Sequence, residues 1–311
     1  MRLNFFNRPC RAVRLITLAG TIALGLLITG STSGNEGPER ITGGGGLELA
    51  VYEAGNPDGP PILFLHGFTQ NHLSWQQQFA GPLAEEFRLV AIDLRGHGAS
   101  DKPLDAHHYN DSGLWANDVA AVIEAAGLDR PVLVGWSYGG YIIADYIRAH
   151  GEDAISGLVF VGAVTKAGTE EAMDMLGEEF KEVLGGVFSR DLHTNIDATR
   201  AFLRMATAEP VDRDFFEFIL ASAMMVPVQV RTGLFDRELD NDDVLSGIRS
   251  PALVIHGAED ELVLASSAEH IAGTVPGARL LLYEGVGHVP FVEDTKRFDR
   301  DLAEFVRAAR E

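Results

Sequence analysis

The stretch Pro131-Val-Leu-Val-Gly135-Trp-Ser137-Tyr-Gly139-Gly-Tyr141 decides the fold. Its first half is a short apolar run that begins at a proline, which is typical of a buried strand. Its second half opens a helical pattern, and the halves meet at Ser137, with Gly135 and Gly139 two residues to either side. A strand, a serine flanked by glycines and a helix together predict a nucleophile elbow.

The elbow has a physical basis in the backbone. A strand that turns into a helix within one residue forces Ser137 into a strained conformation and lifts its hydroxyl away from the main chain. Small residues are needed at positions 135 and 139, because larger side chains would collide there. The start of the following helix offers free N–H groups and the positive end of a dipole to a developing anion. A glycine-rich turn with a chance serine is the alternative, and the flanking strand and helix patterns disfavour it.

Composition sets the broad class of protein. A chain of 311 residues can build one large α/β domain with an insert, and 46% apolar and 23% charged residues are ordinary for a globular protein. The net charge of -20 argues against a nucleic-acid partner, because phosphate binding needs a cationic surface.

Residues 1–34 have the layout of a secretory signal peptide. Basic residues without an acid precede an apolar run from Leu15 to Ile28, and small polar residues follow it. We therefore expect export to the periplasm or medium. No clean Ala-x-Ala cleavage site is present, so an uncleaved N-terminal membrane anchor stays open, and we expect membrane contact only through this segment. The single cysteine, Cys10, precedes the apolar run, so the exported part has no disulfide and no thiol nucleophile.

The rest of the chain divides by its periodicity. Residues 31–46 are rich in glycine, serine and threonine and end in four glycines, and we predict a linker over 35–46. Over 47–165 and 247–311, strand and helix patterns alternate, which predicts an α/β fold with a mostly parallel central sheet and helices on both faces. Between them, 166–246 has no strong strand run and is rich in Met, Phe and Leu, so we expect an inserted helical cap. Which cap side chains face a ligand stays open.

A second loop lies beside the elbow in this arrangement. Ile62 to His66 predicts a buried strand, a loop with Phe68 follows it, and Asn71 to Glu85 predicts a helix. We expect the backbone N–H groups of Phe68 and Tyr138 to form an oxyanion hole. His66 lies at a buried strand end, which favours a structural role.

A serine hydroxyl needs a neutral imidazole to take its proton, and the imidazole needs a carboxylate to fix its tautomer. Asp260 and His288 both follow predicted strands in glycine-containing loops, at the sheet edge that also carries Ser137. We therefore predict a catalytic triad of Ser137, Asp260 and His288. Glu259 and Asp294 stay open as alternative acids.

Neither a metal nor a cofactor is predicted. The chain has no His-Glu-x-x-His motif and no Walker loop. The glycine run at 43–46 precedes a strand instead of joining a strand to a helix, which disfavours dinucleotide binding.

Several motifs together resemble the α/β-hydrolase family over Leu47 to Arg307. They are His66-Gly-Phe68, Asp93-Leu-Arg-Gly-His-Gly-Ala-Ser100, Gly135-Trp-Ser-Tyr-Gly-Gly140, Gly257-Ala-Glu-Asp260 and Gly287-His288. Within the family, the chain is similar to capped esterases, lactonases and cofactor-free haloperoxidase-type perhydrolases. Haloalkane dehalogenases and epoxide hydrolases carry an Asp nucleophile, and Ser137 argues against both. Trp136 departs from the His, Phe or Gln familiar before the nucleophile, and we expect it to narrow the pocket.

The resemblance implies a serine hydrolase that cleaves a carboxylic ester of a small to medium, largely apolar substrate through an acyl-enzyme. The partner it implies is a small ester-like molecule. Perhydrolysis, lactone opening or C–C bond cleavage by the same triad is the first alternative. A ligand-binding protein on a hydrolase scaffold is the second.

Overall fold

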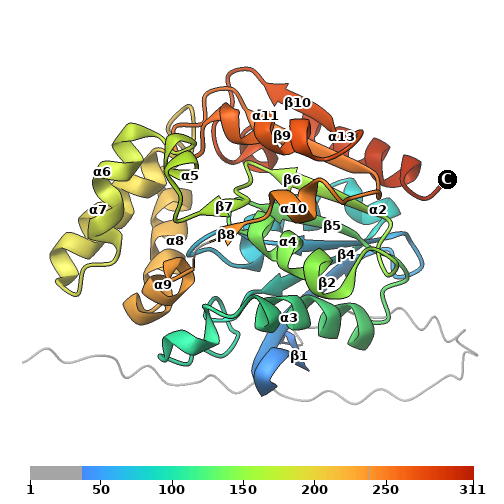
Figure 1. Ribbon diagram of the computed structural model, residues 1–311, viewed down its shortest axis with the longest axis horizontal. Coiled ribbons are helices and arrows are strands. Elements are labelled where there is room, and N and C mark those ends of the chain that lie inside the picture. The colour runs from blue at the N-terminus through green and yellow to red at the C-terminus, as the bar shows by residue number, and fades with distance from the viewer. Residues whose placement is uncertain (1–36, 238) are drawn as a thin grey trace, which may run out of the picture. The chain divides into compact units, whose positions relative to one another are not determined.

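An eight-stranded sheet organises the part of the chain that this computed structural model describes, residues 37–237 and 239–311 (Figure 1). The predicted signal peptide or anchor, 1–34, lies outside the described residues. The strand order is β1-β2-β4-β3-β5-β6-β9-β10. The β1–β2 and β2–β4 pairs are antiparallel, and the other five pairs are parallel. The strands are β1 (Glu39–Thr42), β2 (Glu48–Gly55), β3 (Pro61–Leu65), β4 (Arg88–Asp93), β5 (Val132–Trp136), β6 (Gly157–Val161), β9 (Ala252–Gly257) and β10 (Arg279–Tyr283).

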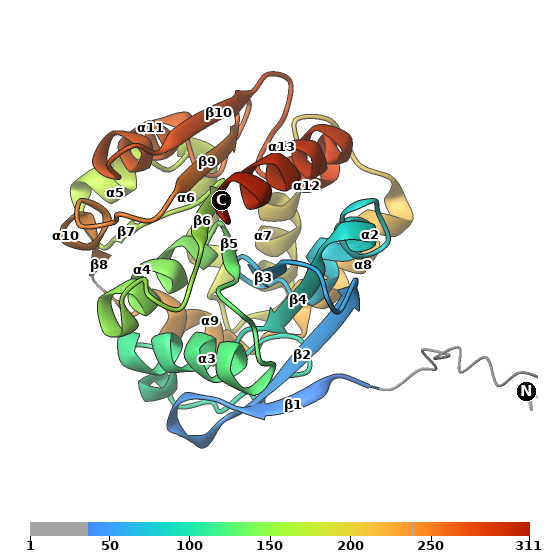
Figure 2. The same ribbon diagram turned by 90° about the vertical axis from the view of Figure 1, so that its right-hand side faces the viewer.

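Helices cover both faces of this sheet, as Figure 2 shows. Strands β3, β5 and β6 are consequently buried along their whole length, which explains why they read as continuous apolar runs. One face packs against α3, α4 and α11, and the other against α2, α12 and α13. These helices are α2 (Leu83–Glu86), α3 (Ser112–Ala125), α4 (Gly139–His150), α11 (Ala265–Thr274), α12 (Pro290–Glu293) and α13 (Thr295–Ala308). The predicted α/β-hydrolase architecture is confirmed.

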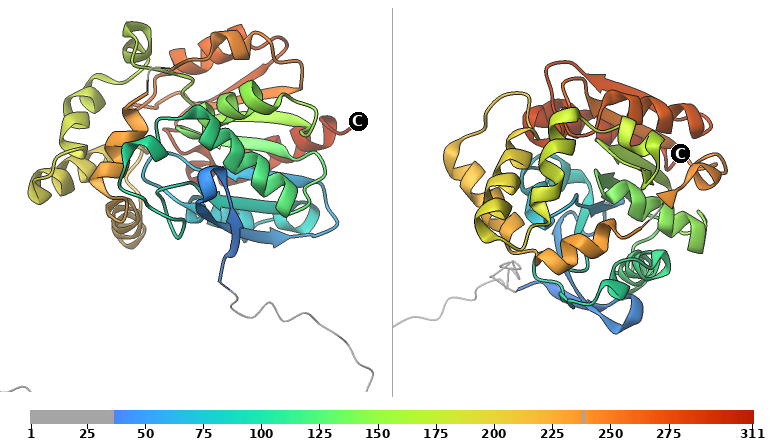
Figure 3. Two further views of the ribbon diagram at one scale, coloured as in Figure 1. Left: turned by 60° about the horizontal axis from the view of Figure 1, so that its bottom comes forward. Right: turned by 60° about the vertical axis from the view of Figure 1, so that its left-hand side comes forward.

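The stretch predicted as a cap is mainly helical, and Figures 1 and 3 show its helices between residues 170 and 235 grouped at one end of the sheet. Two short strands, β7 and β8, pair antiparallel and bring its two ends together. The elements are β7 (Lys166–Ala167), α5 (Glu170–Asp174), α6 (Glu178–Val187), α7 (Leu192–Arg204), α8 (Arg213–Met224), α9 (Val228–Phe235), β8 (Leu239–Asp240) and α10 (Asp242–Leu245). Residues 38–311 form one compact unit, so the boundaries between core and cap stay a prediction.

The linker predicted for 35–46 is wrong over its second half. Residues 39–42 form the edge strand β1, and Ile41 is buried against the sheet. The glycine run folds into a 3-10 turn, η1 (Gly44–Gly46), which Gly45 and Gly46 permit because their φ angles are 69° and 79°. Glycine content suggested a flexible segment, whereas here it allows a tight turn held by hydrogen bonds to the core.

The single helix predicted from Asn71 to Glu85 is also wrong. The chain forms a 3-10 helix η2 (His72–Trp75), a short α1 (Gln76–Phe79) and then α2. Gly81 and Pro82 separate the last two, because proline lacks the N–H that a continuous helix would need. The remaining 3-10 turn, η3 (Ala106–His108), precedes α3.

None of the individual helices among the described residues is long and apolar enough to span a bilayer. The pair α8 and α9 passes on length and composition only when taken together, and the two are bent by 79°.

Candidate active site

The elbow is built as the sequence predicts. Strand β5 ends at Trp136, helix α4 begins at Gly139, and Ser137 between them has a φ of 52°. A Cβ at Gly135 would lie 2.6 Å from the Gly139 carbonyl oxygen, and one at Gly139 would lie 2.7 Å from the Leu65 carbonyl oxygen. Both positions therefore exclude any side chain, and the tight turn holds the serine at the carboxyl edge of the sheet.

The loops after β9 and β10 bring Asp260 and His288 into contact. The Nδ1 of His288 lies 2.7 Å from Oδ2 of Asp260. The other oxygen, Oδ1, accepts hydrogen bonds from the N–H groups of Leu262 and Val263 at 2.9 and 3.0 Å, which fix the carboxylate. This contact places the imidazole proton on Nδ1 and leaves Nε2 as a base. Of the alternative acids, Asp294 instead caps helix α13 through the Arg297 N–H.

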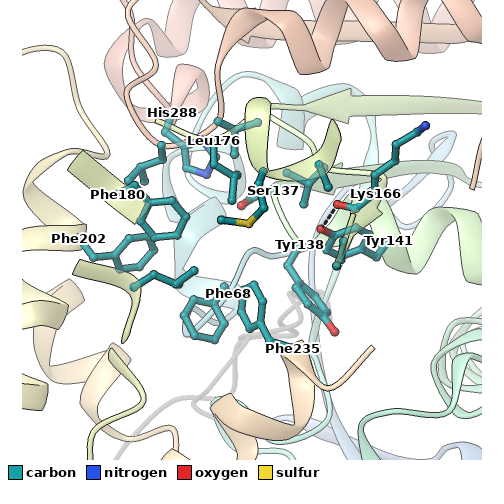
Figure 4. A pocket seen from close by; sticks show the side chains of 18 residues that line it. Phe68, Ser137, Tyr138, Tyr141, Lys166, Leu176, Phe180, Phe202, Phe235 and His288 are labelled. Atoms are coloured by element: carbon teal, nitrogen blue, oxygen red, sulfur yellow. Dashed lines mark hydrogen bonds between the residues drawn. The ribbon is translucent and has the colours of Figure 1, made fainter. Parts of the chain in front are cut away.

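Ser137 and His288 lie in the wall of the same cavity. Figure 4 shows the His288 ring turned toward Ser137. The two side chains are not hydrogen-bonded to each other in this structure, and such contacts in enzymes without substrate are often loose and tighten on binding. The structure thus brings the three predicted triad residues together, and their catalytic roles stay a prediction.

The two predicted oxyanion donors flank the nucleophile. Gly67 lets its loop approach closely, since a Cβ there would lie 3.0 Å from the Cβ of Ser137. Tyr138 is the N-terminal cap residue of α4, where helix N–H groups are free. Within residues 37–237 and 239–311, neither the Phe68 N–H nor the Tyr138 N–H donates a hydrogen bond to the main chain. Both donors are therefore available to a substrate oxygen.

Two buried histidines hold the loop that carries Phe68. The Nδ1 of His66 donates to the Gly67 carbonyl at 2.8 Å, and its Nε2 accepts from the Leu94 N–H at 3.0 Å. The Nε2 of His97 accepts from the Thr69 N–H at 3.3 Å, and Thr69 has a φ of 61°. These contacts require neutral rings, and burial lowers the pKa of His66 to about 4 and that of His97 to about 3. The structural role expected for His66 is confirmed.

These histidines predict a loss of stability in mild acid. Each titrates near pH 6.5 when unfolded and resists protonation when folded, so their stabilisation is present above pH 6.5 and is lost as pH falls toward the folded values. The free energy of unfolding should fall by about 4 kcal/mol between pH 7 and pH 5 from this pair. His256, whose pKa burial also lowers, adds in the same direction. Urea denaturation at several pH values measures the slope.

His97→Gln is the matched variant for this test, because an amide oxygen can still accept the Thr69 N–H and does not titrate. The variant should show a shallower pH dependence than the wild type. Equal unfolding free energies at pH 7 and pH 5 in the wild type would contradict the account.

The cavity above Ser137 is almost entirely apolar. It encloses about 660 Å³ of empty space, including its mouth. Its walls come from the core and from the cap: Phe68, Tyr138, Tyr141, Val164, Ala167, Gly168, Ala172, Met173, Leu176, Phe180, Leu184, Phe202, Phe235, Leu262 and Val263, besides Ser137, Lys166 and His288. The ammonium group of Lys166 is paired at 2.7 Å with both Glu171 and Asp242, and Figure 4 shows it pointing away from Ser137. The chamber therefore suits an uncharged, apolar group.

The prediction that Trp136 narrows the pocket is wrong. Trp136 does not line the cavity that contains Ser137. Side chains alternate along a strand, so the residue before the nucleophile points to the opposite face of β5. There its ring packs against Phe291, and its Nε1 donates to the His288 carbonyl at 2.9 Å.

His256 is a residue of the site that sequence reasoning missed. Its place within a buried strand suggested packing alone. Its Nε2 lies 2.8 Å from the Val263 carbonyl oxygen and 3.3 Å from Oδ2 of Asp260, so it borders the carboxylate that holds His288. The spacing of four residues from Asp260 was the available signal.

Across the described ranges, no group of three or more His, Cys, Asp or Glu side chains could hold a metal ion.

Comparison with known proteins agrees with this geometry. A family profile described as alpha/beta hydrolase fold matches residues 60–295. The chain belongs to the α/β-hydrolase family. This α/β-hydrolase is 30% identical over 288 residues to a bifunctional esterase/perhydrolase of Acinetobacter calcoaceticus, covering 86% of this chain and 99% of the relative. It is 29% identical over 285 residues to a non-heme haloperoxidase of Rhodococcus erythropolis, covering 86% and 99%.

Two solved structures that are similar to this α/β-hydrolase are described as esterases. An esterase from Rhodococcus sp. ECU1013 is 35% identical with a TM-score of 0.83, and the match covers 88% of this chain and 100% of that one. A provisionally assigned aryl esterase from Burkholderia cenocepacia is 38% identical with a TM-score of 0.83, covering 88% and 98%. The resemblance inferred from the motifs is confirmed, as is the expectation of an ester-cleaving hydrolase.

Proposed function

We propose that this α/β-hydrolase cleaves a neutral carboxylic ester with an apolar acyl or aryl group, through an acyl-enzyme on Ser137. His288 Nε2 removes the Ser137 proton as the oxygen attacks the ester carbon. The Phe68 and Tyr138 N–H groups stabilise the oxyanion, and Asp260 stabilises the imidazolium. His288 then protonates the leaving alcohol and activates the water that releases the acid.

The apolar cavity with Ser137 and His288 in its wall is the observation that carries this proposal. An ester that places a phenyl or alkyl group against Phe180 and Phe202 removes apolar surface from water, at roughly 25 cal/mol per Å². Among the described residues that line the cavity, a carboxylate-bearing substrate would find no free cation, because Lys166 is already paired with Glu171 and Asp242. We therefore expect kcat/KM to favour neutral esters over matched esters that carry a carboxylate.

A panel of p-nitrophenyl esters of graded acyl length, with phenyl acetate and charged analogues, tests the proposal. Turnover of neutral esters that rises with acyl size beyond acetate supports it. Binding of such esters without turnover would contradict it and favour a ligand-binding role.

Ala172→Leu tests whether the cap forms the acyl-binding wall. Ala172 lies on α5, is buried and lines the cavity, so a larger side chain shortens the space for the substrate. We expect kcat/KM to fall by about 10-fold for the longer esters and by less than about 3-fold for acetate, since about 1.4 kcal/mol of lost binding is tenfold.

Ala221→Leu is the matched control, because Ala221 is exposed on α8 and does not line the cavity. Uniform losses across all esters in Ala172→Leu, or equal losses in the control, would contradict a cap-lined acyl site.

Perhydrolysis is the second candidate, favoured by the relative from Acinetobacter calcoaceticus that combines esterase and perhydrolase activities. Hydrogen peroxide would replace water in release of the acyl group. Peracid formation measured in the ester assay, with acetate and peroxide present, distinguishes this activity from hydrolysis alone.

We also propose that the protein is exported. The basic start and the apolar run from Leu15 to Ile28 support this, and either cleavage or retention of the segment is compatible with export. N-terminal sequencing of the protein from the cell envelope and medium tests it, and an intact chain confined to the cytoplasm would contradict it.

A further inference from the structure

We propose that Trp136 is a positioning residue for His288, acting through the main chain of the loop that carries the imidazole. The proposal rests on the function proposed above. It concerns how the base is held in place, since Trp136 itself lies outside the cavity and touches no substrate.

The loop from β10 to α12 needs such support. Its six residues, 284–289, include Gly285 and Gly287, and Gly285 has a φ of 72°. Asp260 holds one ring nitrogen of His288, and a single contact at the tip of a side chain does not fix the backbone from which the side chain projects. The peptide groups on either side of His288 decide where Nε2 points.

Each of these peptide groups has a partner. The His288 N–H donates to the Ala206 carbonyl in the cap at 3.0 Å. The carboxylate of Glu293 accepts from the N–H groups of Gly287, at 3.0 Å, and Val289, at 3.3 Å. The His288 carbonyl accepts from Trp136 Nε1 at 2.9 Å, and this contact is buried.

The hydrogen bond from Trp136 Nε1 to the His288 carbonyl connects the residue that precedes the nucleophile to the residue that carries the base. Trp136 precedes Ser137 in the chain and is separated from His288 by 152 residues. The Trp136 ring is held in place by packing, with centroid distances of 5.0 Å to the Phe291 ring and 5.6 Å to the His288 ring. Trp136 therefore links strand β5, which presents the nucleophile, to the loop that presents the base.

Phenylalanine at this position would keep the packing and lose the donor. The buried His288 carbonyl would then lack a partner, and the loop would gain free energy by turning that oxygen toward water. Such a movement carries the imidazole away from Ser137 without changing the walls of the substrate cavity.

Trp75 supplies a matched control within the same cluster. Its ring contacts Phe291 at 4.4 Å, it is fully buried, and its Nε1 has no hydrogen-bond partner among the described residues. Trp75→Phe thus makes the same chemical change beside the same neighbours and removes no hydrogen bond.

The experiment compares kcat and KM of the purified wild type, Trp136→Phe and Trp75→Phe on one p-nitrophenyl ester, well below their melting temperatures. For Trp136→Phe we expect kcat to fall by about 5- to 100-fold with KM within about 3-fold, as follows from losing a donor to a buried acceptor. Trp75→Phe should stay within about 2-fold of the wild type in both. A Trp136→Phe kcat within about 2-fold of the wild type, or equal losses in both variants, would overturn the proposal.

A spectroscopic measurement separates positioning from a purely structural role. The downfield proton resonance of His288 Nδ1–H should be sharp in the wild type and Trp75→Phe and broadened by exchange in Trp136→Phe. An unchanged resonance in Trp136→Phe would contradict a positioning role even where stability falls.

A measurement on the wild type covers the case in which Trp136→Phe does not fold. The Trp136 indole N–H resonance should move when Ser137 is phosphonylated, because its acceptor belongs to His288. The Trp115 indole, which donates to the Tyr109 carbonyl, is the reference. A Trp136 signal that moves no more than the Trp115 signal contradicts the proposal. A wild type without ester turnover would instead contradict the proposed function.

Discussion

Ser137→Ala is expected to lower kcat on a neutral ester by about 10³-fold or more, because it removes the atom that attacks the ester carbon. The fold should persist. Alanine keeps the Cβ of the native residue, so it meets the same backbone strain at a φ of 52° and no new contact with Gly67. Steady-state kinetics together with urea denaturation measure both effects.

Ser156→Ala is the control for this variant. Ser156 is buried, and its hydroxyl has no hydrogen-bond partner among the described residues, so its removal should change neither kcat nor stability by much. Turnover of Ser137→Ala within about tenfold of the wild type would mean that another group is the nucleophile.

Asp118→Ala should cause the largest loss of stability, a fall of about 3–5 kcal/mol in the free energy of unfolding. Asp118 and Arg95 are both fully buried and form two hydrogen bonds of 2.7 Å. Removing the carboxylate leaves a guanidinium in the core that cannot give up its proton. Asp118 also accepts a hydrogen bond from the Gly44 N–H at 2.8 Å, so the turn after β1 should loosen as well.

The exposed pair of Arg307 and Glu86 is the matched control. It has the same two-bond geometry, at 2.7 and 2.5 Å, but both side chains face solvent. Glu86→Ala should therefore cost less than about 1 kcal/mol. Urea denaturation measures the unfolding free energies of both variants. Equal losses of unfolding free energy would contradict the claim that burial makes the Asp118–Arg95 pair matter more for stability than the exposed pair.

Much of the fold could be predicted because its signals are local. Buried parallel strands read as short apolar runs, and Gly135 and Gly139 mark a backbone approach that no side chain permits. The contact between Asp260 and His288 could also be predicted, because each follows a strand of a parallel sheet and such strand ends share one edge.

The lining of the cavity could not be predicted in the same way. Helical periodicity marks the buried face of a cap helix and does not say whether that face meets the core or a ligand. Phe180 and Phe202 line the cavity above Ser137, whereas Phe215, from the same aromatic-rich stretch, lies outside it. Which face a helix presents depends on how the cap packs over the sheet.

The predictions that Trp136 narrows the pocket and that residues 35–46 form a linker were wrong for related reasons. Alternation along a strand places the Trp136 side chain opposite Ser137, yet its partner at His288 is distant in sequence and no spacing rule connects them. The four residues of β1 are too few for a pattern, and the glycines after them suggested flexibility. Residues 39–46 are instead held in place by the pairing of β1 with β2 and by the hydrogen bonds of Gly44 with Asp118 and Arg95.

Titration of the protein with a fluorophosphonate, followed by mass spectrometry of the peptides, tests the central claim most directly. We predict one phosphonyl group per chain, on Ser137, and a loss of ester hydrolysis in proportion to the fraction labelled. Labelling at another residue, or hydrolysis that survives complete labelling of Ser137, would contradict the account.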